Sequence, residues 1–449
     1  MSNSLFNQRA SAASRWALLA RRALPALVAL AALYGPAARA AEPLTLAQAL
    51  HSAERRSAAL AAFDAGALAS REMVVAAGQR PDPVFKAGLN SLPIAGPDRF
   101  NLTRDSSTML SVGLMQEFTR ADKRKARAGR FDREAEVAAA GRTVALAELR
   151  QGTAMAWLDR HYQERMRELL QAQRAETALQ IEAADAAYRG GRGAQTDLFA
   201  ARSAVAQIDE RIGQADIQIA IARTKLTRWI GADAELALAA PPALSRLRLQ
   251  TGDLQSNLEH HPQLVLKASQ EAVARADVEI AQSNKRSDWS VELTVSLRGS
   301  PYSNMVSLNA SMPLQWDQKN RQDREVSARL ALADQLRVQR EDAIREHLAE
   351  VRGWLLQWQG NRGRLEQYER SLIPLASERM RAALAAYRGG AGSLLAVLEA
   401  RRMEIDVRMD RLRLEMETAG LWAQLEYLIA EEHQGSAADR RAAPKEQQP

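Results

Sequence analysis

The chain has 449 residues, a formal net charge of +7 and no cysteine. The absence of cysteine excludes disulfide bonds, thiolate metal sites, catalytic thiols and a lipid anchor on a cysteine. The first 40 residues hold five of the 61 basic residues and no acid, so 56 basic residues face 54 acidic ones in the remainder, a formal +2. So small a surplus gives little support for nucleic-acid binding.

Residues 1–40 have the order of segments that is typical of a secretory signal peptide. Four arginines, the last of them Arg22, precede an apolar run over residues 23–34, and Ala38 and Ala40 flank Arg39. Basic, apolar and A-x-A segments in this order predict cleavage after Ala40. A transmembrane anchor is the alternative, but the apolar run is too short to cross a bilayer.

The first half of the remaining chain, 41–230, predicts helices around one β-hairpin. Helical pattern begins at Thr45, a candidate N-cap, and runs with breaks to about residue 79. Segment 84–118 then predicts two strands around a loop rich in proline, glycine and aspartate. Residues 121–189 are charged, rich in alanine and free of proline, which favours one very long helix. A glycine turn at 189–193 precedes a further helix whose apolar residues are spaced as a heptad seam.

The second half, 263–432, predicts the same order of elements after an irregular connecting segment at 231–262. A helix leads into a hairpin at 288–314, a second long helix runs from about Gln318 to Arg388, and a glycine turn at 388–392 precedes a final helix. Residues 186–193 match 385–392 at seven of eight positions. This agreement indicates an internal duplication. The polar tail 433–449 is predicted to be disordered.

The hairpin at 288–314 has the stronger strand pattern of the two. Apolar residues recur at every second position from Trp289 to Leu297 and from Val306 to Leu314. Each arm has about 10 residues, the length of a strand that crosses a bilayer in a β-barrel. Any half-buried antiparallel hairpin alternates in the same way, so the membrane interpretation depends on the rest of the chain.

Closure of the sheet predicts an assembly of several chains. Two hairpins supply four strands, which cannot close a barrel, and an open sheet edge is not tolerated in a bilayer. Three chains would supply about 12 strands, within the range of outer-membrane barrels. A helix of about 70 residues would extend about 105 Å beyond such a barrel. The predicted fold class is therefore mainly α, with a trimeric 12-stranded membrane β-barrel continued by a coiled-coil α-helical barrel.

The duplicated arrangement and its two Tyr-Arg-Gly-Gly turns resemble the TolC-like outer membrane efflux proteins, or outer membrane factors, along essentially the whole chain after residue 40. The resemblance implies a homotrimer in the outer membrane of a Gram-negative bacterium, in contact with its lipid, with a helical tunnel through the periplasm. It also implies that the turns contact a periplasmic adaptor (membrane fusion) protein. The residues concerned are Tyr188, Arg189, Gly190, Gly191, Gly193, Arg388, Gly389, Gly390 and Gly392. Glycine in such turns also has a purely structural explanation.

The same resemblance implies a gate at the periplasmic entrance. In the family an acid of the first turn region bonds a tyrosine of the second, and Asp197 and Tyr387 stand at those positions. A basic residue and a first inward acid of the family are replaced here by Gly392 and Ala396, which leaves Glu399 at the second acidic position. Asp197 could equally be an ordinary surface acid of a helix.

The resemblance extends to a pump class. Residues 80–83, 115–118 and 123–125 resemble the branch that serves heavy-metal pumps of the resistance-nodulation-division (RND) class. The implied function is passive conduction of heavy-metal cations from an inner-membrane RND transporter, without a cofactor and without a resident metal site. His260-His261 and the 12 methionines are too scattered to indicate such a site.

Other functions remain as alternatives. A drug-efflux duct or a type I secretion duct would have the same tube, because one channel can serve different inner-membrane machines. A periplasmic coiled-coil adaptor explains the long heptad helices but gives no reason for two hairpins of bilayer length. An enzyme is not indicated, because the chain has no H-E-x-x-H, no G-x-S-x-G and no glycine-rich loop between a strand and a helix.

Overall fold

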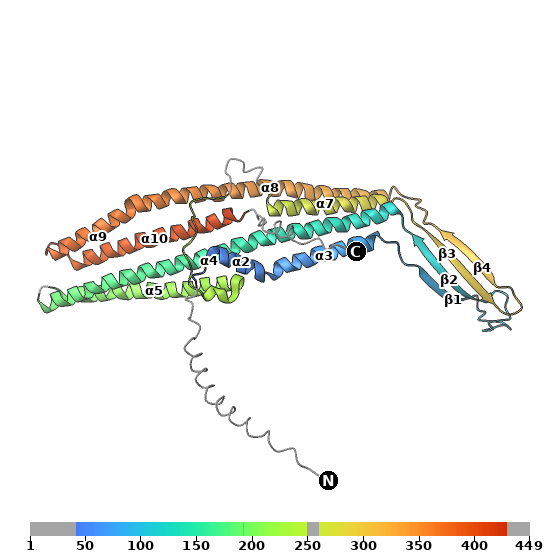
Figure 1. Ribbon diagram of the computed structural model, residues 1–449, viewed down its shortest axis with the longest axis horizontal. Coiled ribbons are helices and arrows are strands. Elements are labelled where there is room, and N and C mark those ends of the chain that lie inside the picture. The colour runs from blue at the N-terminus through green and yellow to red at the C-terminus, as the bar shows by residue number, and fades with distance from the viewer. Residues whose placement is uncertain (1–41, 192, 249–259, 429–449) are drawn as a thin grey trace, which may run out of the picture.

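The computed structural model describes residues 42–191, 193–248 and 260–428, which form an elongated molecule (Figure 1). A β-sheet lies at one end and two helical hairpins reach the other end. The predicted signal peptide 1–40, the tail 433–449 and residues 429–432 of the predicted last helix lie outside the described residues.

The first repeat has the predicted order of helices and strands. Its elements are α2 (Leu46–Arg56), α3 (Ala58–Gly78), β1 (Val84–Asn90), β2 (Met109–Phe118), α4 (Ala121–Arg189) and α5 (Gln195–Ile230). Thr45 is the N-cap of α2 in a capping box, because its hydroxyl accepts from the Gln48 backbone N–H and the Gln48 side chain accepts from the Thr45 N–H. Ser57 caps α3 by accepting from the Leu60 N–H, which explains the break between these helices.

The second repeat follows a connecting segment that begins with the short 3-10 helix η1 (Gly231–Glu235). Its elements are α7 (Pro262–Ser283), β3 (Trp289–Arg298), β4 (Met305–Ser311), α8 (Gln322–Gln367), the π-helical segment η3 (Tyr368–Leu372), α9 (Ile373–Arg388) and α10 (Leu394–Glu426). Leu238 in the connecting segment forms a parallel bridge with Leu44, which joins this segment to the start of the described chain.

The second long helix differs from the prediction of one helix over 318–388. It begins at Gln322, because the Asp317 carboxylate accepts hydrogen bonds from the backbone and side chain of Asn320 and holds a turn there. It is interrupted by η3, because Pro374 has no N–H to donate to the carbonyl four residues earlier, and the wider π-helical turn accommodates this loss. Strand β4 likewise ends before Pro313, at Ser311 instead of Leu314.

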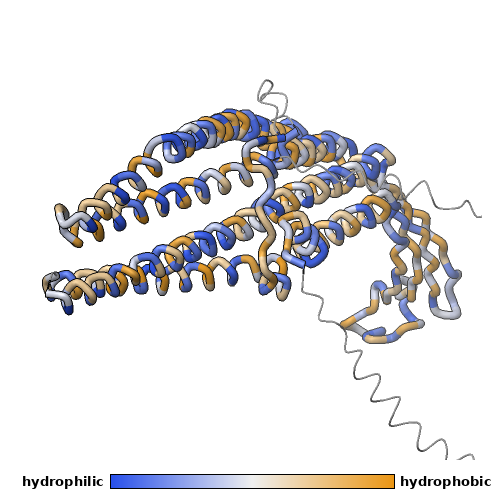
Figure 2. Tube along the Cα trace, turned by 60° about the vertical axis from the view of Figure 1, so that its left-hand side comes forward, coloured by the Kyte–Doolittle hydropathy of each residue, from blue (hydrophilic) through white to orange (hydrophobic). Residues whose placement is uncertain are grey.

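The four described strands form one antiparallel sheet in the order β1-β2-β3-β4, so β2 and β3 join the two hairpins. The register places apolar residues in rows on one face: Phe85, Leu114, Leu293 and Leu308; Ala87, Val112, Val295 and Val306; Leu89, Leu110 and Leu297. Figure 2 shows the alternation of apolar and polar residues along the strands. The apolar face is open, with Phe85 69% and Leu308 73% exposed.

Helix α4 is the central element of the helical part. Helices α3 and α5 lie along one side of α4 (Figure 1). Of these, α3 lies toward the sheet and α5 toward the opposite end of the molecule, which we call the hairpin end. Helices α7 and α10 follow one another along the other side of α4. Helix α8 packs on both α7 and α10, and α9 packs on α10. Among the described residues, no helix is both long and apolar enough to cross a membrane.

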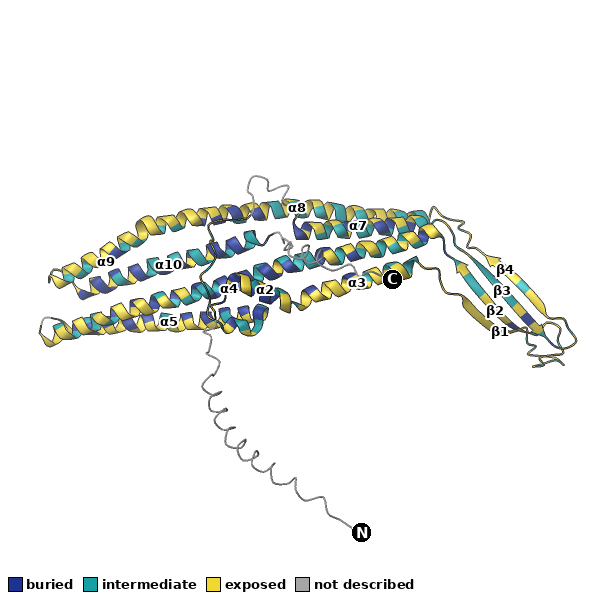
Figure 3. Ribbon diagram, viewed as in Figure 1, coloured by how far each residue is buried: buried dark blue, intermediate teal, exposed yellow. Residues whose placement is uncertain are grey.

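The main apolar core lies where α2, α4, α5, α8 and α10 meet, and buried positions gather along these helices (Figure 3). Trp157 of α4 is fully buried in it and donates its indole N–H to the Leu44 carbonyl at 3.2 Å. The predicted heptad seam of α5 packs on α4, with Val205, Ile208 and Leu226 buried. A second, smaller apolar cluster lies at the hairpin end.

Candidate functional site

The two glycine turns have the same backbone geometry, and both lie at the end of the molecule opposite the sheet (Figure 1). In the first turn the N–H of Gly190 donates to the Ala186 carbonyl at 3.0 Å, and in the second the N–H of Gly389 donates to the Ala385 carbonyl at 2.9 Å. Gly191 and Gly390 have φ values of 68° and 75°, which favour glycine. The duplication read from the sequence therefore extends to the conformation of the turns.

The third glycine of each turn lies close to the helix that precedes it. A Cβ on Gly193 would lie 3.0 Å from the Ala187 Cβ, and a Cβ on Gly392 would lie 3.0 Å from the Ala386 Cβ. Glycine at Gly392, which departs from the family's basic residue, therefore fits the geometry that Gly193 has in the first turn.

The residues predicted to contact an adaptor are mostly exposed at this end. Tyr188, Arg189 and Arg388 are exposed, and the Arg189 guanidinium pairs with Asp185 one helical turn earlier at 2.7 Å. Tyr387, the counterpart of Tyr188, is half-buried and packs against the smaller apolar cluster, whose buried members are Ala184, Leu198, Ala201, Leu394, Val397 and Leu398. This cluster joins the first hairpin, α4–α5, to the second hairpin, α9–α10.

Asp197 lies in the first turn of α5 and is half-buried. An acid at this position is favoured by the partial positive charge of a helix N-terminus. The N-cap of α5, Ala194, has no side chain that can accept a hydrogen bond from the first turn. In α10 the N-cap is Ser393, whose hydroxyl accepts from the Ala396 N–H at 3.2 Å, and Ala396 stands where α5 has Asp197. The start of α10 therefore has a side-chain cap, whereas the start of α5 has an acid in its first turn and no side-chain cap.

The predicted bond between Asp197 and Tyr387 does not form within one chain. Neither side chain hydrogen-bonds or ion-pairs with another described residue, and Glu399 is exposed on α10. The structure brings the three predicted gate residues to the same end of the molecule, on helices α5, α9 and α10.

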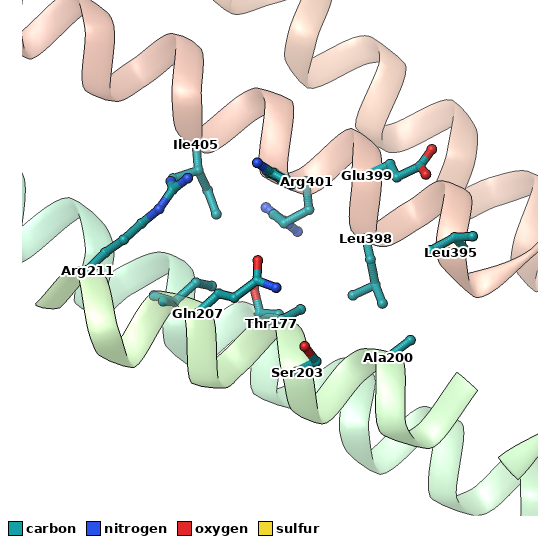
Figure 4. Close-up of a pocket in the computed structure, with 13 residues that line it drawn as sticks. Thr177, Ala200, Ser203, Gln207, Arg211, Leu395, Leu398, Glu399, Arg401 and Ile405 are labelled. Atoms are coloured by element: carbon teal, nitrogen blue, oxygen red, sulfur yellow. The ribbon is translucent and has the colours of Figure 1, made fainter. Parts of the chain in front are cut away.

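A groove of about 300 Å³ lies between α5 and α10 near this end, above α4 (Figure 4). Leu398 of α10 points toward α5, whereas the carboxylate of Glu399 points away from it (Figure 4). Arg211 of α5 closes the far end of the groove by pairing with Asp406 of α10 at 2.8 Å. The first and second hairpins are therefore held together by an ion pair as well as by the apolar cluster.

A buried carboxylate, Glu404 of α10, ties three helices together and was not anticipated from the sequence. Its side chain is 3% exposed and accepts hydrogen bonds from Ser377 of α9 at 2.8 Å and from Arg408 at 2.8 Å. Arg401 pairs with Glu404 at 3.2 Å and also bonds Gln173 of α4 at 3.2 Å. The repeat carries a signal for it, because Glu404 stands where the first hairpin has Val205.

The first hairpin has charged contacts on its surface instead, and Arg174–Asp209 is one of them. The guanidinium of Arg174 on α4 forms two hydrogen bonds with Asp209 on α5, one of them at 3.1 Å. The hydrogen bond from Arg174 lowers the pKa of the Asp209 carboxyl below its ordinary value. Both side chains are nearly half exposed, so this pair contributes little to stability.

The described residues contain no group of three or more His, Cys, Asp or Glu that could hold a metal ion. His261 contacts His347 of α8 instead, with ring centroids 4.0 Å apart in an edge-to-face arrangement. The two rings link the start of α7 to α8, in the middle of the second repeat.

Comparison with known proteins gives a family for the second repeat. Residues 254–431 match the model of the family described as outer membrane efflux protein. A search of curated proteins by sequence finds no match.

Comparison with solved structures gives the fold of most of the chain. The outer-membrane channel OprN is similar with a TM-score of 0.72 and 17% identity, over 85% of this chain and 89% of that one. CusC, whose study concerns transmembrane channel formation, is similar with a TM-score of 0.73 and 15% identity, over 85% and 91%. The CmeC outer membrane channel of Campylobacter jejuni has a TM-score of 0.71 and 12% identity, over 88% of each chain.

Proposed function

We propose that this chain, an outer membrane efflux protein by its fold and by the family match of its second repeat, is the exit channel of a tripartite efflux system. Proteins of this family are passive channels and not enzymes. Three copies form one channel through the outer membrane and the periplasm, and cargo passes without a cofactor. The observation that carries the proposal is the single four-stranded sheet, whose outer strands β1 and β4 each have one strand partner among the described residues.

The sheet supports a shared barrel because its edges and its apolar face are both open. An unpaired strand edge inside a bilayer would leave backbone N–H and C=O groups without partners, at a cost of several kcal/mol each. Pairing β4 of one copy with β1 of the next satisfies both edges, and three copies give about 12 strands, which is in the range of outer-membrane barrels. The apolar rows then face lipid and the opposite, polar face lines the lumen.

The outer helices of the helical part support the same assembly. Helix α3 exposes Leu68 and Val75, and helix α8 exposes Leu330 and Leu356, with exposed fractions from 50% to 70%. These two helices lie at opposite margins of the helical layer, since α3 contacts α4 while α8 contacts α7 and α10. A neighbouring copy in a ring would cover both margins and remove this apolar surface from water.

We propose that Asp197, Tyr387 and Glu399 form the periplasmic gate through contacts between copies. The supporting observation is their common place at the hairpin end, together with the lack of a partner for Asp197 and Tyr387 within the described part of one chain. The tip turns 188–193 and 388–392 are the proposed contact with the periplasmic adaptor.

Single-channel conductance in planar bilayers tests the gate. Asp197→Ala and Tyr387→Phe each remove one side of the proposed hydrogen bond, so each variant is expected to raise conductance. An unchanged conductance in both variants would remove the gate assignment while leaving the channel in place.

We propose heavy-metal cations as cargo, delivered by an RND transporter of the inner membrane. The support is the sequence resemblance of residues 80–83, 115–118 and 123–125 to the heavy-metal branch. Deletion of the gene should sensitise cells to copper, silver, zinc, cobalt or cadmium more than to dyes and detergents. The reverse pattern would assign the protein to the drug-efflux class.

Native mass spectrometry of protein extracted from outer membranes in mild detergent tests the assembly. The expected species is a trimer of a processed chain that begins at Ala41. A monomer recovered from the soluble periplasmic fraction would contradict the shared barrel and would favour the coiled-coil adaptor.

A further inference from the structure

The four described strands carry four charged side chains, and all of them lie on the polar face of the sheet. Lys86, Glu117, Glu292 and Arg298 occupy positions that alternate with the apolar rows. Two are basic and two are acidic, so the face has no net charge. Of the four, Lys86 and Glu292 form an ion pair in the middle of the sheet, with the Lys86 Nζ 2.7 Å from the Glu292 Oε2.

This pair spans a whole strand. Lys86 lies on β1 and Glu292 on β3, so β2 runs between them, and neighbouring strands in a sheet are about 4.8 Å apart. Two positions of β2 lie between them on this face: Gly113, which pairs with Lys86 and with Thr294, and Met115, which pairs with Glu292. A Cβ on Gly113 would lie 2.7 Å from the Thr294 Oγ1 and 3.0 Å from the Leu293 carbonyl oxygen. The missing side chain of Gly113 leaves the path open along which the two charges meet.

The surroundings of Glu292 orient its carboxylate toward this path. Its second oxygen, Oε1, accepts a hydrogen bond from the Thr294 hydroxyl at 3.2 Å. The side chains of Lys86 and Glu292 are 46% and 26% exposed. An ion pair this open contributes about 1 kcal/mol at most to stability. The main effect of the pair is therefore on the electric field at the polar face, and its effect on the stability of the sheet is small.

We propose that Lys86 sets the charge of the barrel lumen: it neutralises Glu292 and keeps the middle of the lumen free of net charge. This inference rests on the proposed function, because it requires the polar face to line the lumen of a trimer. Loss of Lys86 leaves a ring of three carboxylates, which attracts cations and repels anions. With Lys86 in place, the middle of the barrel passes cargo of either sign, and selection by charge takes place elsewhere in the system.

A thiol reporter measures this field directly, because the chain has no cysteine of its own. Ser307 of β4 pairs with Thr294 and shares its row with Gly113 and Lys86 on the polar face. Ser307→Cys in the full-length protein, assembled in liposomes, is treated with a trimethylammonium methanethiosulfonate or with a sulfonate methanethiosulfonate. The ratio of the two labelling rates reports the electrostatic potential at residue 307. This ratio does not depend on which constriction of the channel limits its conductance.

Lys86→Met in this background is expected to raise the cation-to-anion labelling ratio by about fivefold at 0.1 M salt. This estimate takes three charges at about 10 Å in water, with screening over a Debye length of about 10 Å. Glu292→Gln should lower the ratio, and the double variant should return it to the parent value. Lys86→Arg is the matched control and keeps the parent ratio. The exchanged pair, Lys86→Glu with Glu292→Lys, also keeps it, which covers the case in which Lys86→Met fails to assemble.

Two outcomes separate this inference from the proposed function. Val306→Cys on the apolar face should resist both reagents, since lipid covers it. If Val306→Cys is labelled and Ser307→Cys is not, the assignment of the faces is wrong, and the channel proposal falls together with the inference. If Ser307→Cys is labelled but the ratio is the same with Lys86 and with Met at that position, the channel remains and the role of Lys86 is overturned.

Discussion

The first hairpin, α4–α5, and the second hairpin, α9–α10, end in the same glycine turn, but different side chains hold each pair of helices together. Helices α4 and α5 meet through an apolar seam in which Val205 is buried. At the matching position of α10, Glu404 is buried and bonds Ser377, Arg401 and Arg408. The helices that lead to the turns differ as well, since α4 is continuous over 69 residues while η3 separates α8 from α9.

This comparison shows that a duplicated backbone does not require a duplicated core. The turn depends on φ angles and on close approach of backbone atoms, so the same glycines are needed twice. The packing between helices accepts either apolar contact or a fully bonded charge, because both satisfy the buried groups. The apolar hairpin should be sensitive to lost volume and added charge, and the polar hairpin to the loss of one bonding partner.

The largest expected effect is at the buried tryptophan of α4, Trp157. Trp157→Ala should destabilise the helical part by about 3–5 kcal/mol, because a fully buried indole is lost together with its hydrogen bond to Leu44. Trp354→Ala makes the same change at a half-buried position of α8 and should cost much less. Thermal unfolding followed by circular dichroism at 222 nm compares the two variants, and equal losses would contradict the difference between the repeats.

An exchange of the two core residues tests the comparison itself. Val205→Glu places a carboxylate without partners in the apolar seam and should cost about 3 kcal/mol, through desolvation or forced protonation. Glu404→Gln keeps the shape but weakens the bonds from Arg401 and Arg408, and should cost about 1–2 kcal/mol. The same unfolding measurement applies, with Glu399→Gln as the exposed control. A neutral Val205→Glu would mean that the first hairpin tolerates a charge as the second does.

The pH dependence of stability should depend on the histidine pair of the second repeat. Burial and the neighbouring His347 lower the pKa of His261 from 6.5 to about 3. Between these values the unfolded chain binds a proton that the folded chain does not, so stability falls as the pH decreases from 6.5 toward 3. The loss at pH 4.5 is about 3 kcal/mol.

His261→Asn is the variant that tests this dependence. The difference in Tm between pH 7.5 and pH 4.5 should shrink in His261→Asn and should stay unchanged in His51→Asn, which alters an exposed histidine of α2. An unchanged difference in His261→Asn would show that other groups cause the acid sensitivity. From α8, His261 faces the titratable ring of His347. The other ring nitrogen of His347 contacts the carboxylate of Glu350.

The smallest expected effect is at the interruption of the second long helix. Pro374→Ala restores a backbone N–H and allows the π-helical segment to become α-helical, which should stabilise the protein by about 1 kcal/mol. Hydrogen exchange should slow over residues 368–373 in this variant, while the matched control Leu375→Ala keeps the proline and leaves the interruption in place. Unchanged exchange in Pro374→Ala would mean that packing, and not the proline, holds η3.

Local patterns in the sequence determined the elements of this protein. Alternation of apolar residues predicted both β-hairpins, the lack of proline predicted α4, and the matching glycine turns revealed the duplication. These properties depend on neighbours within a few residues, through side-chain period and backbone conformation, so one chain read alone contains them. The interruption at Pro374 also had a local signal.

Only the tertiary structure decided which distant elements meet. Pairing of β2 with β3 joined the two β-hairpins into one sheet. This pairing also brought Lys86 within reach of Glu292, 206 positions away. Folding of α9 and α10 onto α4 gave the buried Glu404 its partners. Such contacts depend on strand order and helix packing, which many sequences with the same local periods could arrange differently.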